Sequence, residues 1–284
     1  MLYVLISVFC SVLVSVILKL AKNKGYQHLH LIFWNYLIAV GLAYLFIPPA
    51  AVQLPISQLP WGLYLPLAIL LPIIFLCIGY SITFSGIVKT EIAQRLSLFI
   101  PLLAAYFIFG EDMAAVKLIG IGIGLFAILF SISWHKGNGA SSSNWLYAVM
   151  VFFGMGVIDI LFKKVALYQA VPYSFSMFFV FALAGAFTLL LILFRAIVKK
   201  EGLPLKSFGW GLLLGLFNFG NILFYMKAHR ALPESPSLVF TGMNIGVILL
   251  GTLIGVSFFA ERLTAFNKVG LFLAVISVLI IAYL

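Results

Sequence analysis

The stretch KLIGIGIGLFAIL, residues 117–129, carries three glycines at alternate positions. Glycines spaced in this way occur in phosphate-binding loops, which follow a strand and precede an acidic residue about 20 positions later. Here the glycines lie inside an uncharged run, residues 118–134, and the next acidic residue is Asp159. At a rise of about 1.5 Å per residue, a helix of this length is close to the minimum that spans the hydrocarbon core of a bilayer.

A membrane-spanning helix changes what these glycines can do. Backbone N–H groups in lipid must bond within their own helix, so they are not free to cradle a phosphate. Gly120 and Gly124 instead form a small-xxx-small face, the pattern that allows two helices to approach closely. We expect this face at a close helix contact, either within one monomer or between two protomers.

Composition extends the membrane interpretation to the whole chain. Of its 284 residues, 64% are hydrophobic and 8% are charged, whereas soluble domains have about 25% charged residues. The sequence therefore predicts an all-α polytopic membrane protein. The first apolar segment, residues 2–18, has no basic region before it and no cleavage motif of small residues after it, so we interpret it as a retained helix.

Several classes of function are disfavoured by the same composition. The net charge of +10 comes from short loops and helix ends, which argues against nucleic acid as a partner. Cys10 and Cys77 both lie in apolar segments and indicate neither a disulfide framework nor a metal site. The predicted spans hold no Ser/His pair, paired aspartates or His/Glu metal motif. We therefore expect no enzymatic activity, no catalytic residues, no cofactor and no bound metal.

Apolar runs separated by short polar breaks predict ten membrane spans. They cover residues 2–20, 29–47, 61–83, 88–109, 115–134, 145–165, 173–198, 208–229, 236–259 and 265–284. The plainly soluble linker among the breaks is HKGNGASSSN, residues 135–144, whose glycine and serine content is typical of flexible linkers. It leaves five spans on each side, so we expect two repeats, residues 1–134 and 145–284.

The ends of the two predicted repeats can be superposed. With an offset of 150, FGEDMAAVKLIGIGIGLFAIL (109–129) matches FAERLTAFNKVGLFLAVISVL (259–279), and Glu111 meets Glu261. Because each repeat has an odd number of helices, the two copies must cross the membrane in opposite senses. We therefore expect ten transmembrane helices arranged as two inverted five-helix repeats. Many secondary transporters follow this plan and bind substrate near the midplane between the halves.

The same segments resemble a known family. FIPLLAAYFIFGE, residues 99–111, followed by a polar break and a glycine-containing helix, resembles the end of an EamA domain of the drug/metabolite transporter superfamily. GVILLGTLIGVSFFAERLTAFNKVGLFLAVISVLIIAYL, residues 246–284, resembles the same element in a second copy. The similarity covers essentially the whole chain as ten helices in two repeats. It implies a carrier that moves a small metabolite or a drug across the membrane by alternating access.

Ionisable side chains inside a span cost about 2.5–3.5 kcal/mol on insertion scales and are therefore functional candidates. The fourth predicted span begins EIAQRLS, residues 91–97. The planar fork of Arg95 suits a substrate carboxylate or phosphate; the alternatives are a pair with Glu91 or an extended side chain at the interface. Under the offset of 150, Gln94 meets Asn244, so each half carries one amide at an equivalent depth.

The sixth predicted span contains the carboxylate that lies furthest inside the membrane. Asp159 is followed at i+4 by Lys163. One hypothesis is that Asp159 binds a substrate amine or carries the coupling proton. The other is that the charge of Asp159 is neutralised by Lys163 and that the pair only holds the helix end.

The eighth predicted span carries a polar stripe. Asn218, Asn221 and Tyr225 recur at i, i+3 and i+7, so they share one helical face that either lines a cavity or bonds a neighbouring helix. His229 and Arg230 follow near the end of this span, where the sequence predicts an interfacial position.

We combine these groups into one predicted substrate site, a midplane cavity between the halves. Its lining consists of Gln94, Arg95, Asp159, Asn218, Asn221, Tyr225 and Asn244. Arg95 would receive an anionic group and Asp159 an amine or a proton, so a zwitterion such as an amino acid suits both.

The expected protein is a secondary transporter of a small metabolite or drug, working in export. Its expected partners are the small-molecule substrate, a coupling proton and the lipid bilayer, with the chain acting as a monomer or a homodimer in a bacterial cytoplasmic (inner) membrane. A flippase for a lipid-linked substrate, from the same superfamily, is the alternative.

Overall fold

The computed structural model describes residues 1–48, 55–85, 93–94, 96–111, 114–131, 145–200, 204–259 and 265–283. Within these ranges every regular element is a helix. The α-helices are α1 (Leu2–Asn23), α2 (His28–Leu45), α3 (Trp61–Ser85), α5 (Phe99–Phe107), α6 (Ala115–Ser131), α7 (Trp145–Leu167), α8 (Tyr173–Lys199), α9 (Phe208–Ala231), α10 (Pro236–Phe259) and α11 (Ala265–Tyr283). Two short 3-10 helices, η2 (Ile56–Gln58) and η3 (Pro204–Ser207), precede α3 and α9.

The helices agree in position with the predicted apolar runs. α7 begins at Trp145, where the second repeat is predicted to start, and α6 and α11 begin at Ala115 and Ala265, 150 residues apart. Among the described residues, six helices are long and apolar enough to cross a membrane, namely α2, α3, α7, α8, α9 and α10. Shorter apolar segments lie in α1, α6 and α11. The prediction of a helical protein with membrane-spanning segments is confirmed for the described residues, and the arrangement as ten helices in two inverted repeats stays a prediction.

The outer surface is apolar along these helices. Leu190, Phe194 and Ile197 of α8 are 64%, 62% and 80% exposed, and Phe153 of α7 is 57% exposed. Large exposed apolar surfaces would favour aggregation in water, whereas in a bilayer they contact lipid chains of the same polarity. Helices are stable in such segments because all their backbone hydrogen bonds are internal.

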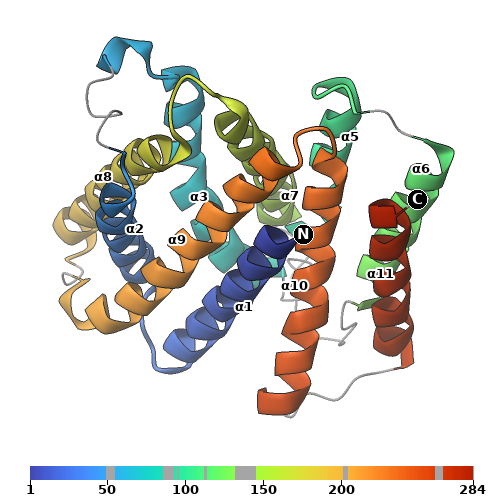
Figure 1. The fold of residues 1–284 in the computed structure, drawn as a ribbon. Helices are drawn as coiled ribbons and strands as arrows, with labels where there is room; N and C mark the ends of the chain where they lie inside the picture. The colour runs from blue at the N-terminus through green and yellow to red at the C-terminus, as the bar shows by residue number, and fades with distance from the viewer. Residues whose placement is uncertain are drawn as a thin grey trace.

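The helices pack as one large group and a flanking pair (Figure 1). In the group, α1 and α2 contact α9, α3 contacts α7 and α8, and α2 also contacts α8. α10 contacts α1 and α5 and joins the group to the pair formed by α6 and α11. Segments from before and after the predicted linker therefore alternate in space rather than forming two separate bundles. The linker itself, residues 135–144, lies outside the described residues.

The closest approach within the flanking pair uses the glycine face predicted from the sequence. Ser277 Oγ of α11 donates a hydrogen bond to the carbonyl oxygen of Gly120, at 2.7 Å. A Cβ atom added to Gly124 would lie 2.6 Å from Ser277 Oγ and 3.3 Å from Ile245 Cδ1. Ala127 and Ala274 of the same contact are fully buried. The predicted close helix contact is confirmed, and it lies within one chain.

We predict that Gly124→Leu lowers the stability of the folded protein, because its side chain has no space between α6, α10 and α11. Overpacking of this kind typically costs about 1–3 kcal/mol. The matched control is Gly122→Leu on the same helix, since a Cβ at Gly122 meets no atom within 4 Å. Thermal unfolding of both detergent-solubilised variants should show a lowered midpoint for the Gly124 variant alone. Equal midpoints would contradict the contact.

Candidate functional site

One face of α9 carries polar side chains from the middle of the helix to its end. Asn218, Asn221 and Tyr225, predicted from the sequence, are continued at i+11 by His229. Asn218 and Tyr225 are buried, His229 is fully buried, and Asn221 is half-buried. At about 1.5 Å per residue this polar face covers about 16 Å of the helix axis, roughly half of a bilayer's hydrocarbon core. It points into the protein and not toward lipid.

Two neighbouring helices bond to this face. Tyr225 Oη donates to Asp159 Oδ1 of α7 at 3.1 Å. Ser7 Oγ of α1 lies 2.8 Å from both the backbone carbonyl oxygen and the side-chain Oδ1 of Asn221, where it can donate to either. Ser7 precedes the predicted linker and Asn221 follows it, so this contact joins the two predicted repeats inside the membrane.

One of the two sequence hypotheses pairs Asp159 with Lys163. In the structure, the two side chains are not hydrogen-bonded to each other. The ammonium group of Lys163 donates to the carbonyl oxygen of Pro233 at 3.2 Å and lies 5.7 Å from the ring centre of Phe109. The side chain is fully buried, and the carboxylates of Glu111 and Glu234 act on its charge. A buried ammonium is tolerated only with such partners, because an isolated charge would lose its hydration without compensation.

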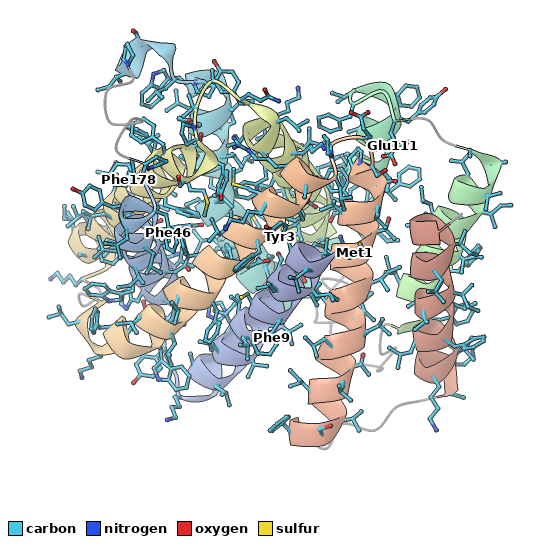
Figure 2. The ribbon with its side chains drawn as sticks, viewed as in Figure 1. Met1, Tyr3, Phe9, Phe46, Glu111 and Phe178 are labelled. Atoms are coloured by element: carbon cyan, nitrogen blue, oxygen red, sulfur yellow. The ribbon has the colours of Figure 1, made fainter. Side chains whose placement is uncertain are left out.

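Glu111 is placed by the turn that ends α5. Gly110 has a φ of 66°, the left-handed conformation that glycine adopts without strain. The N–H of Glu111 then donates to the carbonyl oxygen of Ala105 at 2.9 Å, which closes the end of the helix. Figure 2 shows Glu111 at the upper end of α10.

The carboxylate of Glu111 binds the first turn of α10. Ser237 donates to it from its backbone N–H, at 2.8 Å, and from its hydroxyl group. The first N–H groups of a helix have no partner inside the helix and carry partial positive charge, so a carboxylate there supplies both a hydrogen-bond acceptor and a favourable charge. Glu111 is 4% exposed, and it ties the end of the first predicted repeat to α10 of the second.

Glu111, Lys163 and the first turn of α10 together form a contact that we call the closure. His229 lies next to the closure and has an unusual environment. Its ring centre lies 4.6 Å from that of Tyr225 and 4.8 Å from that of Phe240, in edge-to-face contacts. Neither ring nitrogen has a hydrogen-bond partner among the residues that the structure describes. His229 lies in the last turn of α9, near the end of the span as predicted, but its side chain is covered by protein. The turn between α9 and α10 folds back, so the last turn of α9 is covered by α7 and α10.

Arg230 lies next to His229 at the same helix end and points toward the connection between α7 and α8. Its guanidinium donates to the carbonyl oxygens of Ala166 at 2.6 Å and Val171 at 3.3 Å, and it lies 4.7 Å from the ring centre of Tyr173. Arg230 thus holds the connection between α7 and α8 against α9.

The remaining predicted site residues are not joined to this cluster by hydrogen bonds in the described part of the chain. The amide of Asn244 donates to the carbonyl oxygen of Phe240 in its own helix, at 3.1 Å. Gln94 is half-buried, and its backbone oxygen accepts from Ser97 Oγ at 2.6 Å. Arg95 and Glu91 lie outside the described residues. The structure therefore brings together Asp159, Tyr225 and their neighbours on α9, but it leaves the Arg95 half of the predicted site undescribed.

Two cavities lie beside, and not within, the predicted lining. An apolar cavity of about 290 Å³ between α5 and α6 is lined by Phe99, Leu102, Leu103, Tyr106, Leu118 and Ile121. A second cavity, of about 380 Å³, adjoins the turn between α9 and α10 and is lined by Ala166, Leu167, Gln169, Arg230 and Pro233. Pro233 accepts the bond from Lys163, so the second cavity lies next to the charged closure.

The fold and the buried polar cluster define an α-helical integral membrane protein. No known family model matches the chain. An uncharacterized protein of Haemophilus influenzae is 37% identical over 286 residues, which cover 98% of this chain and 96% of that protein. The chain belongs to the family of this Haemophilus protein. A crystal structure of a further protein covers 99% of this chain and 98% of its own, with a TM-score of 0.72 and 16% identity, and thus shares the fold.

We predict that Glu111→Gln destabilises the protein by about 1–3 kcal/mol, because the charge that faces the first turn of α10 and Lys163 is lost while the side chain keeps its size. Ser237→Ala removes one of the two donors and should have a smaller effect. Glu234→Gln is the control for removal of an acidic charge near Lys163, since Glu234 is exposed. Unfolding midpoints in detergent test this order, and an unchanged midpoint for Glu111→Gln would exclude the proposed closure.

Proposed function

We propose that this protein is a secondary transporter of small metabolites, built from two inverted five-helix repeats, residues 1–134 and 145–284. The observation that carries the proposal is the polar face of α9, which bonds Ser7 on one side and Asp159 on the other at membrane depth. Polar groups in a span are costly unless they face the protein interior, and there they typically mark the path of a substrate or an ion.

The pattern of helix contacts supports the repeat. Pairing the helices in order makes α1, α2, α3, α5 and α6 the counterparts of α7, α8, α9, α10 and α11. Exchanging each helix for its counterpart converts the α1–α9 contact into α7–α3, the α2–α9 contact into α8–α3, and the α1–α10 contact into α7–α5, all of which are present. The α2–α8, α5–α10 and α6–α11 contacts convert into themselves. A two-fold axis between the halves produces these matched pairs, whereas the α7–α9 and α10–α11 contacts have no counterpart of similar extent among the described residues. Inverted repeats place such an axis in the membrane plane.

The proposed site uses the residues predicted from the sequence. Asp159 receives a substrate amine or a proton, Arg95 receives an anionic group, and the amides of Gln94, Asn218, Asn221 and Asn244 donate and accept around them. An amino acid or a similar zwitterion fits these charges. The carrier works by alternating access, in export across a bacterial cytoplasmic membrane.

We predict that a thermal-shift screen with amino acids, sugars, nucleotides and organic cations raises the unfolding midpoint most with zwitterionic amino acids. A ligand that binds only the folded state stabilises it, by about 2.7 kcal/mol at a concentration of a hundred times its Kd. Asp159→Asn should weaken the binding of the same compounds about tenfold or more, because a charged hydrogen bond contributes about 1.5–3 kcal/mol. No shift with any class would contradict the proposal.

The matched control for the screen is Thr188→Val. Thr188 is a buried polar residue of α8, and it bonds only its own helix, at the carbonyl oxygen of Ala184. This variant should keep the ligand response of the unmodified chain. Counterflow of the stabilising compound in reconstituted vesicles then tests transport itself, and equal counterflow in the Asp159→Asn variant would remove Asp159 from the site.

A flippase for a lipid-linked substrate is the second candidate, favoured by the apolar cavity between α5 and α6. Its lining residues Phe99, Leu103 and Leu118 are 46%, 44% and 53% exposed on the outer surface. A lateral opening of this kind admits an acyl chain from the bilayer. A response of the protein to lipid-linked sugars, without any response to soluble compounds, favours this function.

A further inference from the structure

We propose that His229 is a proton-binding site that opens the closure formed by Glu111, Lys163 and the first turn of α10. The inference rests on the proposed transport function and deepens it by naming a second site for the coupling proton and the element that this site moves. Its evidence is the placement of a fully buried imidazole without hydrogen-bond partners beside a buried ammonium.

The neutral imidazole is poorly satisfied in the closed arrangement. A buried donor or acceptor without a partner loses its hydration without compensation, so such groups are rare in folded proteins. Neither ring nitrogen of His229 has a hydrogen-bond partner among the described residues, and the residue is 0% exposed. The ring is held only by the aromatic rings of Tyr225 and Phe240. Burial and the nearby Lys163 ammonium both disfavour an imidazolium in the closed arrangement, so binding of a proton favours an open arrangement in which water reaches the ring.

Protonation has partners in place. The rings of Tyr225 and Phe240 pack edge-to-face against the His229 ring, at centroid distances of 4.6 and 4.8 Å. Asp159 accepts a hydrogen bond from Tyr225, whose ring contacts His229, so one residue separates the carboxylate from the imidazole. In the uptake step, a nitrogen lone pair of His229 bonds a proton from hydronium, which leaves water, and the ring becomes imidazolium.

Charged groups on each neighbouring element determine the consequence. α7 contributes Asp159 and Lys163, the turn after α5 contributes Glu111, and the turn after α9 contributes Glu234; the described residues of α10 include no ionisable side chain. On α9 itself, Lys227 faces Tyr3 of α1, and Arg230 binds the carbonyl groups at the end of α7.

Lys163 is the cation placed to respond, because its ammonium donates to the carbonyl oxygen of Pro233, four residues after His229, and its charge opposes an imidazolium there. Two positive charges in a buried setting repel strongly. An imidazolium therefore drives the Lys163 ammonium away from Pro233, and its carboxylate partner Glu111 moves with it. The hydrogen bonds from Ser237 to Glu111 then break, and the first turn of α10 becomes accessible.

The first arm of the test measures proton binding without any substrate. Nitrogen NMR of isotope-labelled histidine in nanodiscs, recorded from about pH 8 downward, should show a titrating signal of His229 among those of the four histidines. This signal should be missing in His229→Gln. Asp159→Asn should lower the proton affinity of His229 about tenfold, and Lys163→Gln should raise it by a similar factor, because they remove charges of opposite sign. His30→Gln, on α2, is the control and should leave the His229 titration unchanged.

The second arm measures opening at the first turns of α10. Thr241 lies one turn below Ser237 on the same face and is 1% exposed. In a chain with Cys10 and Cys77 replaced by alanine, the thiol of Thr241→Cys should react faster with a hydrophilic thiol reagent as pH falls. Adding His229→Gln should abolish this pH dependence. In the control variant Thr188→Cys, the thiol should react slowly with the same reagent at every pH.

The outcomes separate this inference from the transport proposal. A His229 that stays neutral throughout, a titration unmoved by both charge variants, or Thr241 labelling that ignores pH would each overturn the proton site, whatever the ligand screen shows. If His229→Gln folds poorly, the Lys163→Gln arm retains the imidazole and gives the decisive shift. A proton site found in a protein that binds no compound in the screen would instead count against the transport function alone.

Discussion

The absence of water around the spans is the constraint on which the rest of the structure depends. Backbone groups must bond within their own helix, so the described elements are helices, and helix contacts depend on shape because lipid is as apolar as leucine. Gly124 lets α6 approach α11 until Ser277 can bond the backbone of Gly120. Polar side chains follow the same constraint: Ser7 and Asp159 bond the inward face of α9, whereas Thr188 and Asn244 bond carbonyl groups of their own helices.

Periodicity predicted the helices well because each apolar run is long and bounded by polar residues or glycine. α6 and α11 begin where the offset of 150 requires, and the face of Asn218, Asn221 and Tyr225 points inward, as its spacing on α9 indicated. Spacing along one helix could not predict which chain segment returns to cover it. The place of His229 near the end of an apolar run predicts a position at the membrane interface. It does not predict that the turn before α10 folds back and buries the side chain.

The same limit explains Lys163. Its i+4 position beside Asp159 suggests a pair, yet the ammonium reaches Pro233, and Tyr225 takes the carboxylate. Both partners come from segments about 65–70 residues away, which no local pattern encodes. A signal was present in Phe-Gly-Glu, residues 109–111: a glycine that ends a helix, followed by an acid. The pattern recurs in part at residues 259–261. The group that Glu111 binds, Ser237 in the first turn of α10, lies 126 residues further along the chain and could not be predicted from this pattern.

The pairing of α6 with α11 also has a consequence for how the chain is assembled. The hydrogen bond between Ser277 and Gly120 joins residues that are 157 positions apart. During synthesis, α6 is complete long before α11 exists, so its glycine face spends that time without its partner. Close-packing faces of small residues attract any helix that fits them. Correct folding therefore requires the later helix to displace whatever lipid or neighbouring segment has occupied the groove, which makes this contact a late step and a natural point for chain-to-chain exchange.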